Sequence, residues 1–244
     1  MIKLAIAVPF GGRRVAPEWA VALANLQVPM NCTYARLTVK GQPRDVARAT
    51  LVDTARQMGA QYVLFLDDDT APPSETIVRL VALLDNRPDV AAAGGIYVSR
   101  GGAVAEPVVF QAEGAGPYWD WRVGEIFRCW GIGTGCLMIR LSVFDTLPRP
   151  WFRNVDHLDE AAGLPQHAGT IGYTMTEDLF FCRRVAEAGG AILAHGGILP
   201  IHYGEDGVPH VLDPESAPLR GTDAGRLWYA PLVQERPATA AAAR

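Results

Sequence analysis

The chain has 244 residues, of which 49% are hydrophobic and 20% charged, so it is long and apolar enough to form a globular core. Its formal net charge of −4 argues against a general nucleic-acid coat, although it leaves room for a local basic groove. No apolar run approaches the roughly 18 residues of a membrane span, and the opening MIKLAIAVPF meets Pro9 and Gly11 too soon for a signal peptide.

These features predict a single cytoplasmic domain over residues 1–236, followed by a low-complexity tail at 237–244 that we expect to be disordered. The four cysteines include no C-x-x-C pair, so the sequence suggests neither a zinc knuckle nor a disulfide framework.

The first half of the chain alternates strand-like runs with helix-period segments. The pattern predicts a strand at 3–8, a helix from Pro17 to Leu26, a strand at 33–39 and a helix from Pro43 to Gly59. This last helix has an apolar stripe, and Arg44 and Arg48 fall off it. The stripe consists of Ala47, Leu51, Ala55 and Met58.

The second half continues the same alternation. The patterns predict a strand at 61–66, then a helix that has Ser74 as its N-cap and ends before Pro88, and then a strand at 90–98. Residues 99–130 are rich in glycine and aromatic residues and have no readable period. Further on, the patterns predict a strand at 133–140, a short helix at 142–147, a loop at 148–174, a helix at 177–188, a strand at 191–195 and a last ordered feature at 200–204. The alternation is typical of an α/β sheet with helices on its faces.

The segment VLFLDDDTAPP runs from a buried strand directly into Asp67, Asp68 and Asp69. Adjacent carboxylates near an apolar strand end are costly unless a cation, a ligand or water takes up their charge. Alternate residues of an extended segment point the same way, so we expect Asp67 and Asp69 to converge and Asp68 to turn away. Two carboxylates on one side suit Mg²⁺ or Mn²⁺; a solvated acidic turn is the alternative.

A family resemblance follows from these residues and two later motifs. LFLDDD at a strand end, TEDLFFCRRVAEAGG, and the histidine of IHYG together resemble the glycosyltransferases of GT-A fold. The chain is similar over most of its length to glycosyltransferase family 2 and its compact phage-encoded relatives. The resemblance implies a GT-A, Rossmann-like fold with a mixed, mostly parallel sheet, and a catalytic domain over residues 1–236.

The resemblance also implies a metal-dependent reaction on a nucleotide-sugar. The D-x-D pair would hold Mn²⁺ or Mg²⁺ against the donor diphosphate, with Asp69 as direct ligand, Asp67 on the ribose or a metal-bound water, and His202 as the late metal-binding histidine. UDP-glucose is the default donor. A histidine satisfied by the backbone is the alternative for His202.

The same resemblance assigns catalytic and nucleotide-binding residues. Asp178 of the Glu177-Asp178 pair would take the proton from the acceptor hydroxyl in an inverting displacement, although acidic residues also favour a helix start by themselves. The remaining residues of the nucleotide-sugar site would be Val8, Pro9, Phe10, Arg48, Asp67, Asp68, Gly94 and Gly95. Arg48 stands before Ala49 where relatives carry asparagine, so a surface arginine without a role is the alternative. Gly94 and Gly95, like Gly133 and Gly135, would border the ligand or serve as plain turn residues.

The acceptor is open between a hydroxymethylated base in phage DNA and a saccharide. A DNA acceptor needs a basic groove, for which the middle region offers arginines. These are Arg100, Arg122, Arg128, Arg149 and Arg153. Trp119, Trp121 and Trp130 could stack on a sugar or base, or belong to the core.

Two other functions fit parts of the sequence. LDDDT is similar to the pattern of haloacid dehalogenase-like phosphatases, but that pattern needs threonine or valine where Ala71 stands, and its strand comes first in the chain. A non-catalytic carbohydrate-binding protein could share the fold without needing Asp178.

Overall fold

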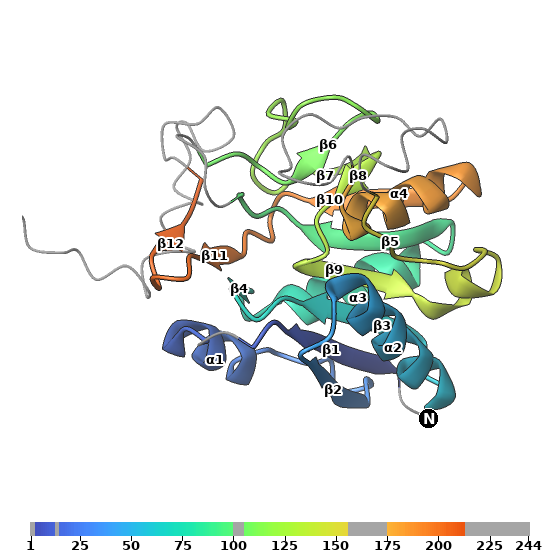
Figure 1. Ribbon diagram of the computed structural model, residues 1–244, viewed down its shortest axis with the longest axis horizontal. Helices are drawn as coiled ribbons and strands as arrows, with labels where there is room; N and C mark the ends of the chain where they lie inside the picture. Colours follow the sequence, from blue (N-terminus) through green and yellow to red (C-terminus); the bar gives the residue numbers. More distant parts are fainter. Residues whose placement is uncertain (1–2, 13–14, 100–104, 156–174, 213–244) are drawn as a thin grey trace, which may run out of the picture.

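The computed structural model describes residues 3–12, 15–99, 105–155 and 175–212 (Figure 1). The predicted domain reaches beyond these ranges at both ends, and the tail 237–244 lies outside them. The elements in chain order are β1 (Leu4–Phe10), α1 (Pro17–Ala24), β2 (Tyr34–Lys40), α2 (Arg44–Gln57), β3 (Tyr62–Leu66), β4 (Thr70–Ala71), α3 (Thr76–Asn86), β5 (Val90–Gly95), β6 (Val109–Phe110), β7 (Ile126–Cys129), β8 (Gly131–Ile132), β9 (Cys136–Arg140), the 3₁₀ helix η1 (Leu141–Asp145), α4 (Glu177–Glu187), β10 (Ala191–His195), β11 (Ile201–Tyr203) and β12 (Pro209–His210).

A central sheet organises the molecule. Within the described ranges it has seven strands in the order β2-β1-β3-β9-β5-β10-β7 (Figure 1). β1 is parallel to β2 and β3, and β5 is parallel to β10. β9 lies antiparallel between β3 and β5, and β7 is antiparallel to β10. Most of these strands run in one direction, so the predicted mixed, mostly parallel sheet is confirmed.

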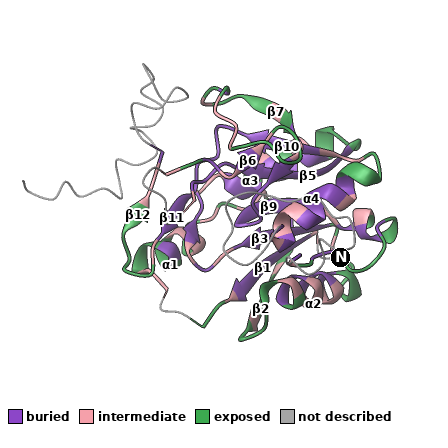
Figure 2. Ribbon diagram, turned by 45° about the horizontal axis from the view of Figure 1, so that its top comes forward, coloured by how far each residue is buried: buried purple, intermediate pink, exposed green. Residues whose placement is uncertain are grey.

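Helices cover both faces of this sheet because alternate strand residues point to opposite sides. Ala5 and Phe65 belong to the core that α2 and α4 cover, which includes Leu51. Leu4 and Leu64 belong to the core that α3 and α1 cover. Figure 2 shows buried residues concentrated in the central strands and exposed residues toward the outer surfaces of the helices.

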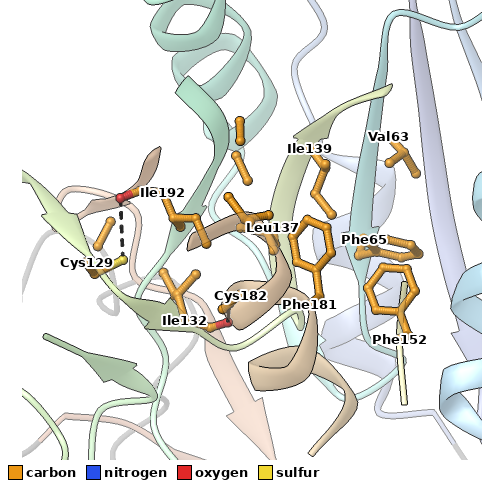
Figure 3. Packing of buried hydrophobic residues seen from close by; sticks show 14 of the residues in the cluster. Val63, Phe65, Cys129, Ile132, Leu137, Ile139, Phe152, Phe181, Cys182 and Ile192 are labelled. Atoms are coloured by element: carbon orange, nitrogen blue, oxygen red, sulfur yellow. Dashed lines mark hydrogen bonds between the residues drawn. The ribbon is translucent and has the colours of Figure 1, made fainter. Parts of the chain in front are cut away.

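The core under α4 is aromatic. The rings of Phe181 and Phe152 stack with centroids 5.2 Å apart, and Phe65 meets Phe152 edge-on at 5.7 Å. Figure 3 shows Phe181 facing this cluster and the sheet residues Leu137 and Ile139. The interlocking rings fix α4 against the sheet, and with it the position of the helix start.

A second, small sheet lies beyond the end of β3. Here β11 pairs antiparallel with β4 and with β12. His202 stands opposite Thr70 in this register, and the Tyr203 amide donates to the Asp69 carbonyl oxygen at 2.7 Å. These backbone bonds place the late histidine beside the aspartate turn.

Several predicted elements differ from the structure in their limits. The strand predicted at 90–98 ends at Gly95, where the chain leaves the sheet and Ile96 donates instead to the Ile198 carbonyl at 2.9 Å. The strand predicted at 133–140 begins only at Cys136, because residues 133–135 form a turn after β8. The predicted helix at 142–147 is the 3₁₀ helix η1.

The helix ends differ by one or two residues, as helix boundaries commonly do. Ser74 is not the N-cap of α3: Glu75 holds that position, and the Ser74 hydroxyl donates to the Glu75 carboxylate at 3.1 Å. α1 ends at Ala24 rather than at Leu26. No described helix is both long and apolar enough to cross a bilayer.

We predict that Phe181→Ala lowers the free energy of unfolding by about 3–5 kcal/mol, because it removes a completely buried ring from the aromatic cluster. Urea denaturation followed by circular dichroism measures the change. Val21→Ala is the control on α1, where the side chain is 52% exposed and the expected change stays within about 0.5 kcal/mol. Equal losses in the two variants would contradict this account of the core.

Candidate functional site

A cavity of about 530 Å³ lies at the carboxyl end of β3, where ligands sit in open α/β sheets. It is bounded by the start of α2, the aspartate turn, the segment after β5, the start of α4, and β11. The lining residues are Arg44, Arg48, Asp67, Asp69, Tyr97, Ser99, Glu106, Pro107, Val108, Phe110, Gly114, Ala115, Gly116, Pro117, Thr176, Glu177, Asp178, Leu179 and His202.

The three aspartates divide between two sides, as predicted, but through a different geometry. Residues 67–70 form a turn in which the Thr70 amide donates to the Asp67 carbonyl at 3.1 Å, rather than an extended segment. Asp67 and Asp69 face the cavity. The Asp68 carboxylate points to the loop after β1, where it accepts the Gly11 amide at 2.8 Å. The turn therefore presents carboxylates both to the cavity and to the loop after β1.

Arg48 is the largest departure from the sequence-based expectation. Although it falls off the predicted stripe, it is only 1% exposed and is a main buried residue of α2. Its Nη2 donates to both carboxylate oxygens of Asp67 at 2.9 and 3.2 Å, and its Nε donates to Glu177 Oε1 at 3.3 Å. The idea of a surface arginine without a role is therefore wrong.

The carboxylates around Arg48 keep its guanidinium charged, and Arg48 in turn acts on Glu177. Burial lowers the pKa of Arg48, but the Asp67 and Glu177 carboxylates more than offset this and hold that pKa above its usual range. Burial raises the pKa of Glu177, the charge of Asp178 adds to the rise, and Arg48 opposes it. Arg48 therefore stays charged and links the end of β3 to the start of α4.

The start of α4 presents Asp178 to the cavity. The Thr176 hydroxyl and the Leu179 amide both bind Asp178 Oδ1, the latter at 2.9 Å. The Glu177 amide donates to Asn154 Oδ1 at 3.1 Å, which secures the first turn of the helix. With Oδ1 held by two donors, Oδ2 is the oxygen available to a ligand.

Asp69 and His202 face one another across the cavity wall, with 3.4 Å between Asp69 Oδ1 and His202 Nε2. His202 Nδ1 lies 2.6 Å from the Val98 carbonyl oxygen and donates to it, so Nε2 is the ring nitrogen that faces Asp69. A carboxylate is a ligand that Mn²⁺ and Mg²⁺ prefer, and an imidazole nitrogen beside it favours Mn²⁺ of the two. The two donors therefore fit a divalent cation.

The predicted metal site, with Asp69 and His202 as ligands and Asp67 on the ribose or a metal-bound water, stays a prediction. The described residues contain no group of three side chains that could hold a metal by themselves. The Asp67 carboxylate accepts from Arg48, and Asp69 and His202 face each other. A cation here would take its remaining ligands from substrate and water, which is common for Mg²⁺ and Mn²⁺ bound with phosphates.

The part of the cavity lining that the structure describes is acidic. It includes five carboxylates, from Asp67, Asp69, Glu106, Glu177 and Asp178, against the guanidinium groups of Arg44 and Arg48. Such an excess of negative charge repels a free diphosphate and attracts a divalent cation.

Six predicted nucleotide-site residues do not line this cavity, and Asp68, which points to the loop after β1, is one of them. Val8 and Pro9 are buried in β1, and Phe10 packs edge-on against Trp19 with ring centroids 5.8 Å apart. A Cβ on Gly94 would lie 2.7 Å from the Cys136 carbonyl oxygen, and one on Gly95 would lie 2.6 Å from Ile198. Tight backbone packing is therefore sufficient reason for these two glycines.

Tyr97 is a cavity residue that sequence reasoning missed. It is buried just after β5, and its hydroxyl accepts the Gly135 amide at 3.1 Å. A Cβ on Gly133 would lie 2.1 Å from that hydroxyl oxygen, so the glycines of the 133–135 turn make room for Tyr97. Gly133 and Gly135 were the signal that the sequence offered, but glycines do not indicate which side chain fills the space beside them.

The arginines and tryptophans of the middle region lie elsewhere. Arg122, Arg128, Arg149 and Arg153 are exposed and do not line the cavity, and Arg100 lies outside the described residues. Trp121 is buried in the core, and Trp119 packs against it; neither they nor Trp130 line the cavity.

Comparisons with known proteins show the fold. No protein-family model and no curated protein matches the chain. Protein A197 from STIV superposes with a TM-score of 0.56 at 16% identity, covering 88% of this chain and 97% of its own. A crystal structure of GalNAc-T7 with UDP, GalNAc and Mn²⁺ superposes with a TM-score of 0.52 at 11% identity, covering 87% of this chain but only 45% of its own. The architecture is therefore a GT-A-like α/β fold.

We predict that Arg48→Met lowers the free energy of unfolding by about 3–5 kcal/mol, because Asp67 and Glu177 then lose their buried cationic partner. Arg56→Met is the matched control on α2, where a half-exposed pair with Asp145 contributes at most about 1 kcal/mol. Urea denaturation measures both. A loss for Arg48→Met no larger than that of the control would show that the bridge is not structural.

Proposed function

We propose that the chain is a metal-dependent glycosyltransferase that moves a sugar from a nucleotide-sugar to an acceptor hydroxyl. One juxtaposition carries the proposal: Asp69 and His202 face each other at 3.4 Å in the cavity that Asp178 enters from the start of α4. The GT-A-like fold supports it, since a nucleotide diphosphate, a sugar and Mn²⁺ accompany GalNAc-T7 in its structure.

Asp69 and His202 would hold the Mn²⁺ or Mg²⁺, and the acidity of the cavity favours such a cation before the donor binds. When bound, the cation supplies Lewis-acid neutralisation of the charge that develops on the departing diphosphate. Arg44 and Arg48 add positive charge at the same wall. Asp67, fixed by Arg48, would contact the ribose.

Asp178 would act as the general base. Its Oδ1 is held by Thr176 and Leu179, so Oδ2 would accept the proton of the acceptor hydroxyl as that oxygen attacks the anomeric carbon. The bond from the anomeric carbon to the diphosphate oxygen breaks in the same step, so the configuration inverts. Glu177 would keep the helix start in place through Arg48.

The donor is proposed to be a UDP-sugar, with UDP-glucose as the default. We keep the loop after β1 as the nucleobase site, because Asp68 faces that loop through Gly11. Val8, Pro9 and Phe10 end β1 beside it. Gly94 and Gly95 would contribute only through the packing of the sheet.

A saccharide hydroxyl is the acceptor that the cavity favours. The described arginines that could grip DNA lie outside this acidic cavity, which disfavours a polyanion. A hydroxymethylated base in phage DNA is the second acceptor to test. Release of UDP from a panel of UDP-sugars, with Mn²⁺ and either simple saccharides or hydroxymethylated DNA, separates the two.

We predict that Asp69→Asn and His202→Ala each weaken Mn²⁺-dependent binding of UDP by more than about tenfold, because each removes a metal ligand. Calorimetry with and without Mn²⁺ measures this. Asp89→Asn is the control, since Asp89 forms an exposed pair with Arg87. Unchanged binding in both site variants, or metal-independent binding by the wild type, would overturn the proposed metal site.

We predict that Asp178→Asn lowers kcat by about 10²–10⁴ while UDP binding with Mn²⁺ is retained, because only proton acceptance is lost. Turnover assays and calorimetry on the same preparation test this, and NMR of the product anomer tests inversion. Wild-type turnover in the Asp178→Asn variant would favour a different base, whereas the absence of both turnover and Mn²⁺-dependent UDP binding in the wild type would favour a non-catalytic carbohydrate-binding protein. Hydrolysis of simple phosphate esters through a phosphorylated Asp67 would favour the phosphatase alternative.

A further inference from the structure

Tyr97 occupies a central place in the cavity that none of the roles above explains. It is 7% exposed and lines the cavity together with Asp67, Asp178 and His202. Its ring meets the His202 imidazole edge-on, with centroids 5.3 Å apart. It therefore touches the metal side of the site while belonging to the chain that leaves β5.

The structure fixes the Tyr97 hydroxyl closely. The Gly135 amide donates to its oxygen at 3.1 Å, and the Gly135 carbonyl in turn accepts the Asp67 amide at 3.1 Å. Cβ atoms on Gly133 and Gly135 would lie 2.1 and 2.9 Å from that same oxygen. Two glycines and a hydrogen bond thus hold one hydroxyl at one point beside the end of β3.

The proton of this hydroxyl has no acceptor among the residues that the structure describes. Its oxygen accepts from Gly135, so the O–H group is left as a donor on the cavity wall. A phenol is protonated at neutral pH, so the hydroxyl is a hydrogen-bond donor.

The ligand that meets this donor follows from the neighbours of Tyr97. The phosphate side of the cavity already has Arg44, Arg48 and the Asp69–His202 pair, whereas the base side has Asp178. Tyr97 lines the same cavity as both of these groups, and the group being transferred must sit between them. A neutral O–H donor suits a sugar hydroxyl oxygen, since a phosphate would be held better by the cations nearby.

We propose that Tyr97 is a specificity-determining residue that donates a hydrogen bond to a hydroxyl oxygen of the sugar being transferred. This inference rests on the proposed glycosyltransferase function. In this arrangement the Gly133–Gly135 turn fixes the position of the Tyr97 hydroxyl in the cavity.

The test compares UDP with a UDP-sugar in wild type and Tyr97→Phe by calorimetry in Mn²⁺. The UDP-sugar is the one that wild type binds most tightly among UDP-glucose, UDP-galactose and UDP-N-acetylglucosamine. We expect Tyr97→Phe to bind UDP within about twofold of wild type, because its ring still packs on His202. It should bind the UDP-sugar about 2- to 13-fold more weakly, as loss of one hydrogen bond predicts.

Tyr62→Phe is the matched control. Tyr62 begins β3 at the opposite end from Asp67, and its hydroxyl donates to Asp85 at 2.7 Å, outside the cavity. It should bind UDP and the UDP-sugar as wild type does. Because Tyr97→Phe also leaves the Gly135 amide unpaired, melting curves are recorded for both variants, and binding is measured well below their midpoints.

A second measurement does not depend on the stability of the variant. Binding of UDP-sugar analogues that each lack one sugar hydroxyl is measured for wild type and for Tyr97→Phe. One analogue should bind wild type more weakly than the complete UDP-sugar does. In Tyr97→Phe that same analogue should bind as tightly as the complete UDP-sugar. Equal weakening of UDP and UDP-sugar by Tyr97→Phe, or no weakening of either, would overturn the inference. If wild type binds no UDP with Mn²⁺, the proposed function itself fails, which is a distinct result.

Discussion

The buried guanidinium of Arg48 is the interaction on which the rest of the site depends. It lies in a helix that covers the sheet, and it binds one carboxylate at the end of β3 and another at the start of α4. Two like charges would otherwise repel in a poorly hydrated space, so neither segment could keep its position without the cation between them. The same contact occupies the Asp67 carboxylate, whereas Asp69 faces His202.

The acidity of the cavity lining follows from this arrangement and determines which ligands the cavity favours. One internal cation balances only part of the negative charge, and the remaining carboxylates lie where a strand end, a helix start and the small sheet meet. Such a lining attracts a divalent cation and repels a free anion. On the proposed function, the cation would therefore bind before or together with the anionic donor.

The glycines near the site illustrate how packing and function share residues. Gly94 and Gly95 allow β5 to lie against its neighbours, whereas Gly133 and Gly135 leave the space that Tyr97 fills. In the sequence both are simply pairs of glycines beside a strand, adjacent at 94–95 and separated by Thr134 at 133–135. Only the atoms that a Cβ would meet distinguish a packing glycine from one that shapes a cavity.

The sequence by itself determined the α/β class and the existence of most helices and strands, because these follow from local periodicity. It predicted the split of the aspartates from an extended segment, whereas a turn produces it. It could not determine that Arg48 is buried, since its partners Asp67 and Glu177 lie far along the chain and a lone arginine in a helix looks solvated. Nor could it show that Tyr97, predicted within a strand, follows the end of β5 and lines the cavity, or that Asp69 faces His202. Those outcomes depend on which strand ends, helix starts and side chains meet in space, and only the tertiary structure decides that.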